Sequence, residues 1–118
     1  MTISNFDSQK FMQDYNKWRS ISFPAETAEA DEVYDLRYDV FELDANIAGI
    51  FITFADSDFR DINHNLNDKK LSDLLRRAKE LKKSVEKHDS ECVDRYIEYM
   101  ELMLSMYNNY KKLSSQSE

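Results

Sequence analysis

The sequence predicts an all-α fold, namely an antiparallel up-and-down bundle of about four helices, two of which are long. The first observation is composition: the 118 residues include one glycine and one proline, where an average chain of this length has roughly eight glycines. β-Hairpins depend on glycine-containing turns, whereas helices joined by polar loops do not. The second observation is that apolar residues recur at spacings of three and four in four segments, which is the period of amphipathic helices.

Length and apolar content predict one hydrophobic core. The chain has the usual size of a single domain, and 42% of its residues are apolar, which is more than a disordered segment contains. We therefore expect one helical domain spanning residues 1–118, with a frayed polar tail over about 114–118.

Two helices are predicted in the first half of the chain. The first spans about 5–19, where Ser4 and Asp7 have the spacing of a capping box. The second spans about 25–56, with Pro24 close to its first turn. Its expected core residues form three unbroken heptads: Val33, Leu36, Val40, Leu43, Ile47, Ile50 and Phe54. Residues 47–54 are rich in β-branched side chains and hold the only glycine, so a strand is the alternative there.

Two further helices are predicted in the second half, over about 68–87 and 90–113. An Asp- and Asn-rich loop precedes them and contains a possible helical turn around residues 59–62. The two helices are separated by a short connection in which Asp89 or Ser90 is expected to be the N-cap. Because the connection is so short, these helices should be antiparallel neighbours. The last helix has a wide apolar face, which includes Cys92, the only cysteine.

The chain is acidic, with a formal net charge of −7. The charge is uneven, since residues 21–66 carry a net −9 and residues 67–88 a net +4. An acidic chain is a poor direct ligand for nucleic acid, which requires a basic field, but it suits a basic protein partner. A single cysteine, no apparent secretory signal and apolar runs too short to cross a membrane predict a cytoplasmic protein that binds no membrane.

The second predicted helix has more apolar surface than one packing seam requires. Tyr34, Tyr38 and Phe41 begin a second row, which continues through Ala45, Ala48 and Ile52. One interpretation is that this helix lies at the centre of the bundle and packs on both sides. The other is that the three aromatic residues belong to a surface for a second copy or another partner, because aromatic residues are enriched at interfaces.

Two helix faces carry rows of carboxylates at spacings of three and four. The first row contains Glu32, Asp35, Asp39 and Glu42, and the second contains Glu91, Asp94, Glu98 and Glu101. Like charges at these spacings repel one another, so the rows call for an offsetting charge. The cations Lys69, Arg76, Lys83 and Lys87 of the third helical segment are one candidate. A basic partner, such as the cleft of an enzyme that acts on nucleic acid, is another.

A divalent metal is the third explanation. Glu32 with Asp35, and Glu91 with Asp94, could converge on Mg²⁺ as carboxylate pairs do in helical nucleotide pyrophosphohydrolases, although the carboxylates of that family are closer in sequence. Asp61 and His64 are too few ligands for a firm site. One glycine cannot form a phosphate-binding loop, so no cofactor or catalytic residue is predicted.

These features favour a small acidic binding module over an enzyme. The best-fitting role is an immunity, antitoxin or inhibitor protein that neutralises a basic, nucleic-acid-acting partner, because such proteins are small and carry no catalytic signature. A homodimeric adaptor or regulatory subunit is the alternative within the same class. A Mg²⁺-dependent nucleotide pyrophosphohydrolase is the alternative from a different class.

Overall fold

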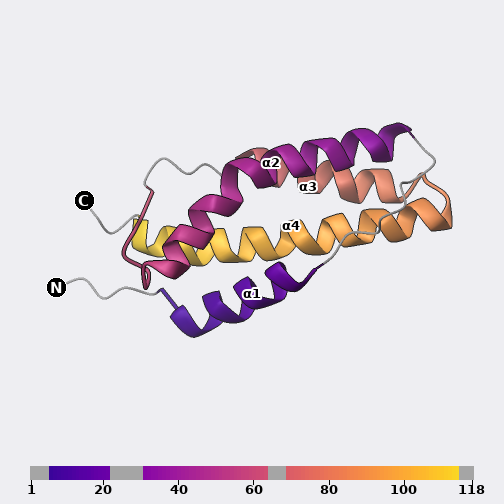
Figure 1. Cartoon of the computed structure of the whole chain (residues 1–118). Helices are drawn as coiled ribbons and strands as arrows, with labels where there is room; N and C mark the ends of the chain where they lie inside the picture. The colour runs from indigo at the N-terminus through magenta and orange to yellow at the C-terminus, as the bar shows by residue number, and fades with distance from the viewer. Residues whose placement is uncertain (1–5, 22–30, 64–68, 115–118) are drawn as a thin grey trace.

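The computed structural model describes residues 6–21, 31–63 and 69–114. Four helices account for most of them: α1 (Ser8–Ser20), α2 (Asp31–Asp56), α3 (Lys69–Lys82) and α4 (Lys87–Ser114). The described residues are 85% helical and include no strand. Successive helices run in opposite directions (Figure 1). The predicted fold class is therefore confirmed, including the two long helices α2 and α4.

α1 begins three residues later than predicted because Asp7, not Ser4, is its N-cap. Asp7 has an extended backbone, with φ −106° and ψ 99°, and its carboxylate accepts a hydrogen bond from the Lys10 backbone N–H at 3.0 Å. An Asp in this position satisfies a backbone donor of the first turn that would otherwise have no partner. Ser4 lies outside the described residues.

The helical prediction for 47–54 is confirmed, and the strand alternative is wrong. α2 ends at Asp56 as predicted, while Pro24 and the expected start near 25 lie outside the described residues. One detail of the core row is wrong: the fully buried residue of this turn is Phe51, whereas Ile50 is only partly buried. Gly49 is exposed, and a Cβ added there would meet no neighbouring side chain or other helix within 4 Å among the described residues.

The turn after α2 is not helical, contrary to the prediction for 59–62. Asp58 and Phe59 both have positive φ, at 59° and 67°. The Phe59 N–H donates to the Phe54 carbonyl at 2.8 Å, and the Ser57 hydroxyl accepts from two backbone N–H groups that follow it. A left-handed Phe is strained, and its ring is held here among the rings of Phe6, Phe11 and Phe54.

The boundary between α3 and α4 also differs from the prediction. α3 ends at Lys82 rather than at 87, because the Ser84 N–H and hydroxyl both donate to the Leu81 carbonyl and close the last turn. α4 then begins at Lys87, three residues early. Asp89 is consequently buried within the first turn of α4, and neither Asp89 nor Ser90 is the N-cap.

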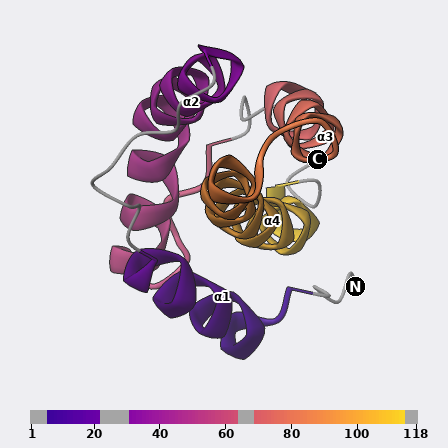
Figure 2. The same ribbon diagram turned by 90° about the vertical axis from the view of Figure 1, so that its right-hand side faces the viewer.

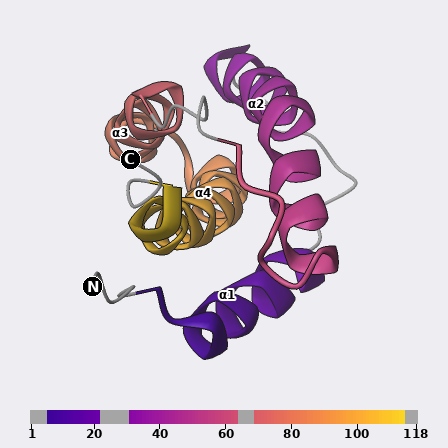
Figure 3. The ribbon, with the colours of Figure 1, turned by 90° about the vertical axis from the view of Figure 1, so that its left-hand side faces the viewer.

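α4 is the central helix, and the interpretation that placed the second predicted helix at the centre is wrong. α4 contacts each of the other three helices, and the end views show it between α1 and α3, with α2 passing alongside (Figures 2 and 3). α2 packs against α3 and α4. Its second half reaches α1, where Phe51 and Phe54 contact Phe11 edge to face.

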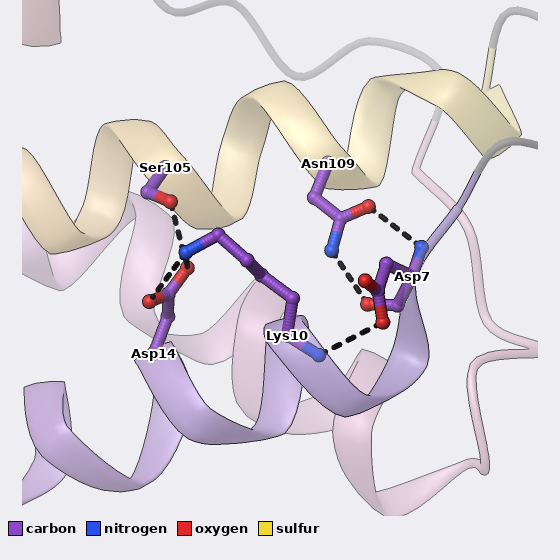
Figure 4. Close-up of polar contacts among 5 residues, drawn as sticks. All are labelled: Asp7, Lys10, Asp14, Ser105 and Asn109. Atoms are coloured by element: carbon purple, nitrogen blue, oxygen red, sulfur yellow. Dashed lines mark hydrogen bonds and ion pairs between the residues drawn. The ribbon is translucent and has the colours of Figure 1, made fainter.

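Polar contacts fix α1 against α4 (Figure 4). The Asn109 side chain donates to the Asp7 carbonyl at 2.7 Å and accepts from the Asp7 N–H at 2.9 Å. One turn earlier in α4, the Ser105 hydroxyl donates to the buried carboxylate of Asp14 at 2.7 Å, and Lys10 contacts the same carboxylate at 3.3 Å. These bonds set the register of the two helices. No helix within the described residues has the length and apolar character needed to cross a membrane.

Candidate functional site

The outer face of α2 exposes three large aromatic side chains, which we call the aromatic row. Tyr34, Tyr38 and Phe41 are 45%, 69% and 38% exposed, respectively. Their spacings of four and three residues place them on one face of α2. The opposite side of this part of α2 is buried through Val33, Leu36 and Val40, so the neighbouring helices cover only that side.

Burial of the second apolar row of α2 changes along the helix. Ala48 and Ile52, near its C-terminal end, are partly buried against the core, whereas Ala45 and the aromatic row are exposed. The prediction that this row packs inside the bundle is therefore wrong for Tyr34, Tyr38 and Phe41 and correct for the C-terminal half. The exposed part is the part that a partner can contact.

The carboxylates of α2 lie beside the aromatic row on the side of α3, and we call them the acidic row. Glu32, Asp35 and Glu42 are exposed, and none of these three forms an ion pair within the described part of the chain. Asp39 is half-buried and accepts from the guanidinium of Arg77 in α3. Three of the four predicted carboxylates therefore face solvent next to exposed rings.

The carboxylates of α4 are largely engaged by cations within the bundle. Asp94 pairs with Lys82 of α3, Glu101 pairs with Lys79 of α3 at 3.3 Å, and Glu98 lies 3.8 Å from Arg95 of its own helix. Glu91 is exposed. Two carboxylates of this row therefore pair with α3, one pairs within α4, and Glu91 is exposed.

Cations of α3 neutralise three of the eight carboxylates, Asp39, Asp94 and Glu101, and these cations are different from those expected. Arg77, Lys79 and Lys82 face the two neighbouring helices. Arg76 and Lys83 instead pair with Asp73 and Glu80 of their own segment. Lys87 belongs to α4.

Two tyrosines of α4, Tyr96 and Tyr99, interact with side chains of α2. The Tyr99 hydroxyl donates to the carboxylate of Asp44, and burial, followed by this bond to a carboxylate, raises the pKa of Tyr99 above its ordinary value. Burial also raises the pKa of Tyr96, while the positive charge of Arg37 opposes that rise. The Tyr99–Asp44 bond links the middle of α2 to α4.

Arg37 is a residue of the candidate surface that sequence reasoning missed. Its guanidinium lies over the ring of Phe41, 5.1 Å from the ring centroid. The spacing of four residues between Arg37 and Phe41 was the available signal, since such residues are neighbours on a helix.

The structure does not gather the carboxylates into a metal centre. The part of the chain that it describes, which includes Glu32, Asp35, Glu91 and Asp94, contains no group of three or more His, Cys, Asp or Glu side chains placed to hold a metal ion. Of the pair Asp61 and His64, His64 lies outside that part. Cys92 is buried in the core, as predicted.

The chain is thus an acidic helical bundle that displays aromatic rings and unpaired carboxylates side by side on one helix. Comparison with family models, with curated proteins and with solved structures finds no match.

Proposed function

We propose that this protein is a binding module that uses the outer face of α2 to engage a basic protein partner. The best-fitting role is that of an immunity, antitoxin or inhibitor protein acting on an enzyme of nucleic acid, and we expect it in the cytoplasm. The observation that carries the proposal is the aromatic row, Tyr34, Tyr38 and Phe41, exposed beside the acidic row on a well-packed helix.

The aromatic row supports a protein partner. Large rings left in water forgo the stabilisation that burial provides, about 25 cal/mol per Å² of apolar surface. Tyrosine is favoured at interfaces because its ring buries a large area while its hydroxyl still finds a hydrogen-bond partner. Tyr38, the most exposed of the three, lies in the middle of the row and is the expected anchor of the contact.

The charge distribution supports a basic partner. Residues 21–66, which contain α2, carry a net −9 within a chain of net −7. A field of this sign attracts a basic cleft and raises its association rate, while it repels nucleic acid itself. It also opposes association of two copies through this face, because Asp35 and Glu42 add like charge to the contact. Enzymes that act on nucleic acids have the basic clefts that suit such a face.

The test compares two charge variants in affinity capture from a lysate of the host organism. Asp35→Lys with Glu42→Lys changes the acidic row, and Glu80→Lys with Glu86→Lys changes exposed residues that belong to neither carboxylate row. Both variants have a net charge of −3, because each substitution adds two units to −7. Wild type and the second variant should retain the same basic protein, and the first variant should lose it because its attraction is reversed.

Two results would contradict the proposal. One is equal capture by both variants, which would mean that α2 is not the contact. The other is a wild-type chain that retains no basic protein. A wild type that sediments as a dimer, and that Tyr38→Ala dissociates, would assign the aromatic row to a second copy.

A further inference from the structure

Gly49 is the only glycine of the chain and lies in the interior of α2. Apart from proline, glycine is the least favourable residue inside a helix. Packing does not account for it, because a Cβ there would meet no neighbouring side chain or other helix within 4 Å among the described residues. Backbone conformation does not account for it either, since its φ is not positive. The space that a side chain would fill is open to another molecule.

Gly49 lines a cleft between the C-terminal half of α2 and the chain that follows this helix. The volume of the cleft is about 390 Å³, which is in the size range of ligand sites. Figure 3 shows the segment after α2 running back beside the helix. The described residues that line the cleft are Asn46, Gly49, Ile50, Thr53, Asp61 and Asn63.

The wall of the cleft opposite α2 is held at both ends. At its start, the Ser57 hydroxyl accepts from the backbone N–H groups of Arg60 and Asp61 at 3.2 and 2.9 Å. At its end, the Tyr110 hydroxyl donates to the Asn63 carbonyl at 2.8 Å and accepts from the Asn63 N–H. Asp61 is therefore fixed between two anchored points on the wall that faces Gly49.

The cleft is acidic and has open acceptor groups. Asp61 is the only charged residue among the described ones that line it. Neither the Asp61 carboxylate nor the Thr53 hydroxyl forms an ion pair or hydrogen bond within the described part of the chain. The complementary group is a cation on an apolar stem, because its N–H groups donate to the carboxylate while its methylenes lie along Gly49 and Ile50.

The cleft continues the face of α2 that carries open carboxylates. Asp35, Glu42 and Gly49 follow one another at spacings of seven residues. Residues seven apart lie on nearly the same side of an α-helix, about 10 Å from one another along its axis. A protein that contacts Asp35 and Glu42 therefore extends to the cleft.

We propose that the cleft at Gly49 receives a lysine or arginine side chain of the basic partner, and that the missing side chain at Gly49 keeps the cleft open for it. The inference rests on the proposed function and specifies one contact of that function. The cation binds the Asp61 carboxylate, and the partner's chain passes close to the α2 backbone at Gly49, which only glycine allows without a Cβ in the way.

A single glycine makes a direct test possible. The chain labelled with ¹⁵N-glycine gives one glycine amide signal in a nuclear magnetic resonance spectrum, that of Gly49. Octa-lysine is the probe, and its titration should shift this signal along the same binding curve as the fluorescence anisotropy of the fluorescein-labelled peptide. Octa-lysine acetylated on its side chains has lost their charge and should leave the signal in place.

Variants test the two walls of the cleft. Gly49→Gln should raise the melting temperature by about 2–6 °C, because glutamine is a better helix former, yet it should weaken octa-lysine binding about two- to fivefold. Asp61→Asn should weaken binding by a similar factor, and the double variant should be no weaker than the weaker single one, since both remove one contact. The matched controls Ser72→Gln and Glu86→Gln, at exposed positions outside the cleft, should bind like wild type.

The outcomes separate this inference from the proposed function. If Asp35→Lys with Glu42→Lys weakens octa-lysine binding but the Gly49 signal does not move, or Gly49→Gln binds like wild type, the basic-partner surface stands and the cleft inference is wrong. The inference also fails if acetylated octa-lysine shifts the signal equally, or if Gly49→Gln lowers the melting temperature. If Asp35→Lys with Glu42→Lys binds octa-lysine as tightly as Glu80→Lys with Glu86→Lys does, the inference and the proposed function both fail.

Discussion

Replacing Phe54 with alanine is expected to lower the free energy of unfolding by about 3–5 kcal/mol. The Phe54 ring is fully buried and lies within 5.5 Å, centroid to centroid, of four other rings, namely those of Phe6, Phe11, Phe59 and Tyr110. Its removal leaves a cavity where α1, α2, α4 and the turn after α2 meet, and rings packed edge to face cannot close it without losing their own contacts. Urea unfolding followed by circular dichroism measures the change.

Phe41→Ala is the matched control, because Phe41 is on the same helix but belongs to the aromatic row. We expect this change to cost less than about 1 kcal/mol, since the ring is 38% exposed and its loss opens no internal cavity. Similar losses for the two variants would show that the Phe41 ring contributes to the core, and would remove the distinction between the two faces of α2.

Alkaline pH is expected to unfold the protein. Burial is the main cause that raises the pKa values of Tyr96, Tyr99 and Tyr110 above 10.0, the value of a free tyrosine. Above that pH the unfolded chain loses these protons while the folded chain keeps them. The stability that the neutral tyrosines contribute is fully present below pH 10 and declines as pH rises toward the folded-state values, by up to about 1.4 kcal/mol per pH unit for each group.

Urea midpoints measured from pH 8 to 12 test this expectation. The curve should be nearly level at the lower end and fall steeply above pH 10, and Tyr99→Phe should make the fall shallower because one titrating group is gone. A midpoint that stays level to pH 12 would mean that the tyrosine hydroxyls ionise freely in the folded protein.

The helices could be predicted from sequence because their apolar spacing is a local property. The boundary between α3 and α4 could not, because two local signals compete: Asp89 and Ser90 have the character of an N-cap, while Ser84 closes α3 through the Leu81 carbonyl. Val85 lies between the two helices and is partly buried against the core. Its position depends on tertiary packing. Sequence periodicity alone does not decide between such ends.

The apolar pattern of α4 contains a signal for its central position. Its apolar face is wide, and the buried pairs Cys92–Val93 and Tyr99–Met100 are each adjacent in sequence. Adjacent residues lie about 100° apart around a helix, so each pair can face more than one neighbour. Periodicity identifies which side of a helix is apolar, but not which helix has neighbours on several sides. For that reason, the sequence identified the aromatic row without deciding whether Tyr34, Tyr38 and Phe41 would be covered.

The candidate surface was partly predictable in the same way. All eleven candidate residues were recognised from their spacing, yet the structure separates them by their partners. Asp94 and Glu101 bind lysines of α3, whereas Asp35 and Glu42 remain exposed beside the rings. Which carboxylate meets which cation depends on the side of α3 that faces each neighbour, and that is set by packing rather than by local sequence.

Phe41→Asp gives the most direct test of the claim that α2 presents a binding face. Circular dichroism and sedimentation should show a folded monomer like the wild type, and the same variant should no longer retain the basic partner in affinity capture. That combination requires Phe41 to be dispensable for folding and necessary for binding. An unfolded variant would place Phe41 in the core, where a charge without a partner costs several kcal/mol, and a folded variant that retains the partner at wild-type strength would show that α2 binds nothing through this face.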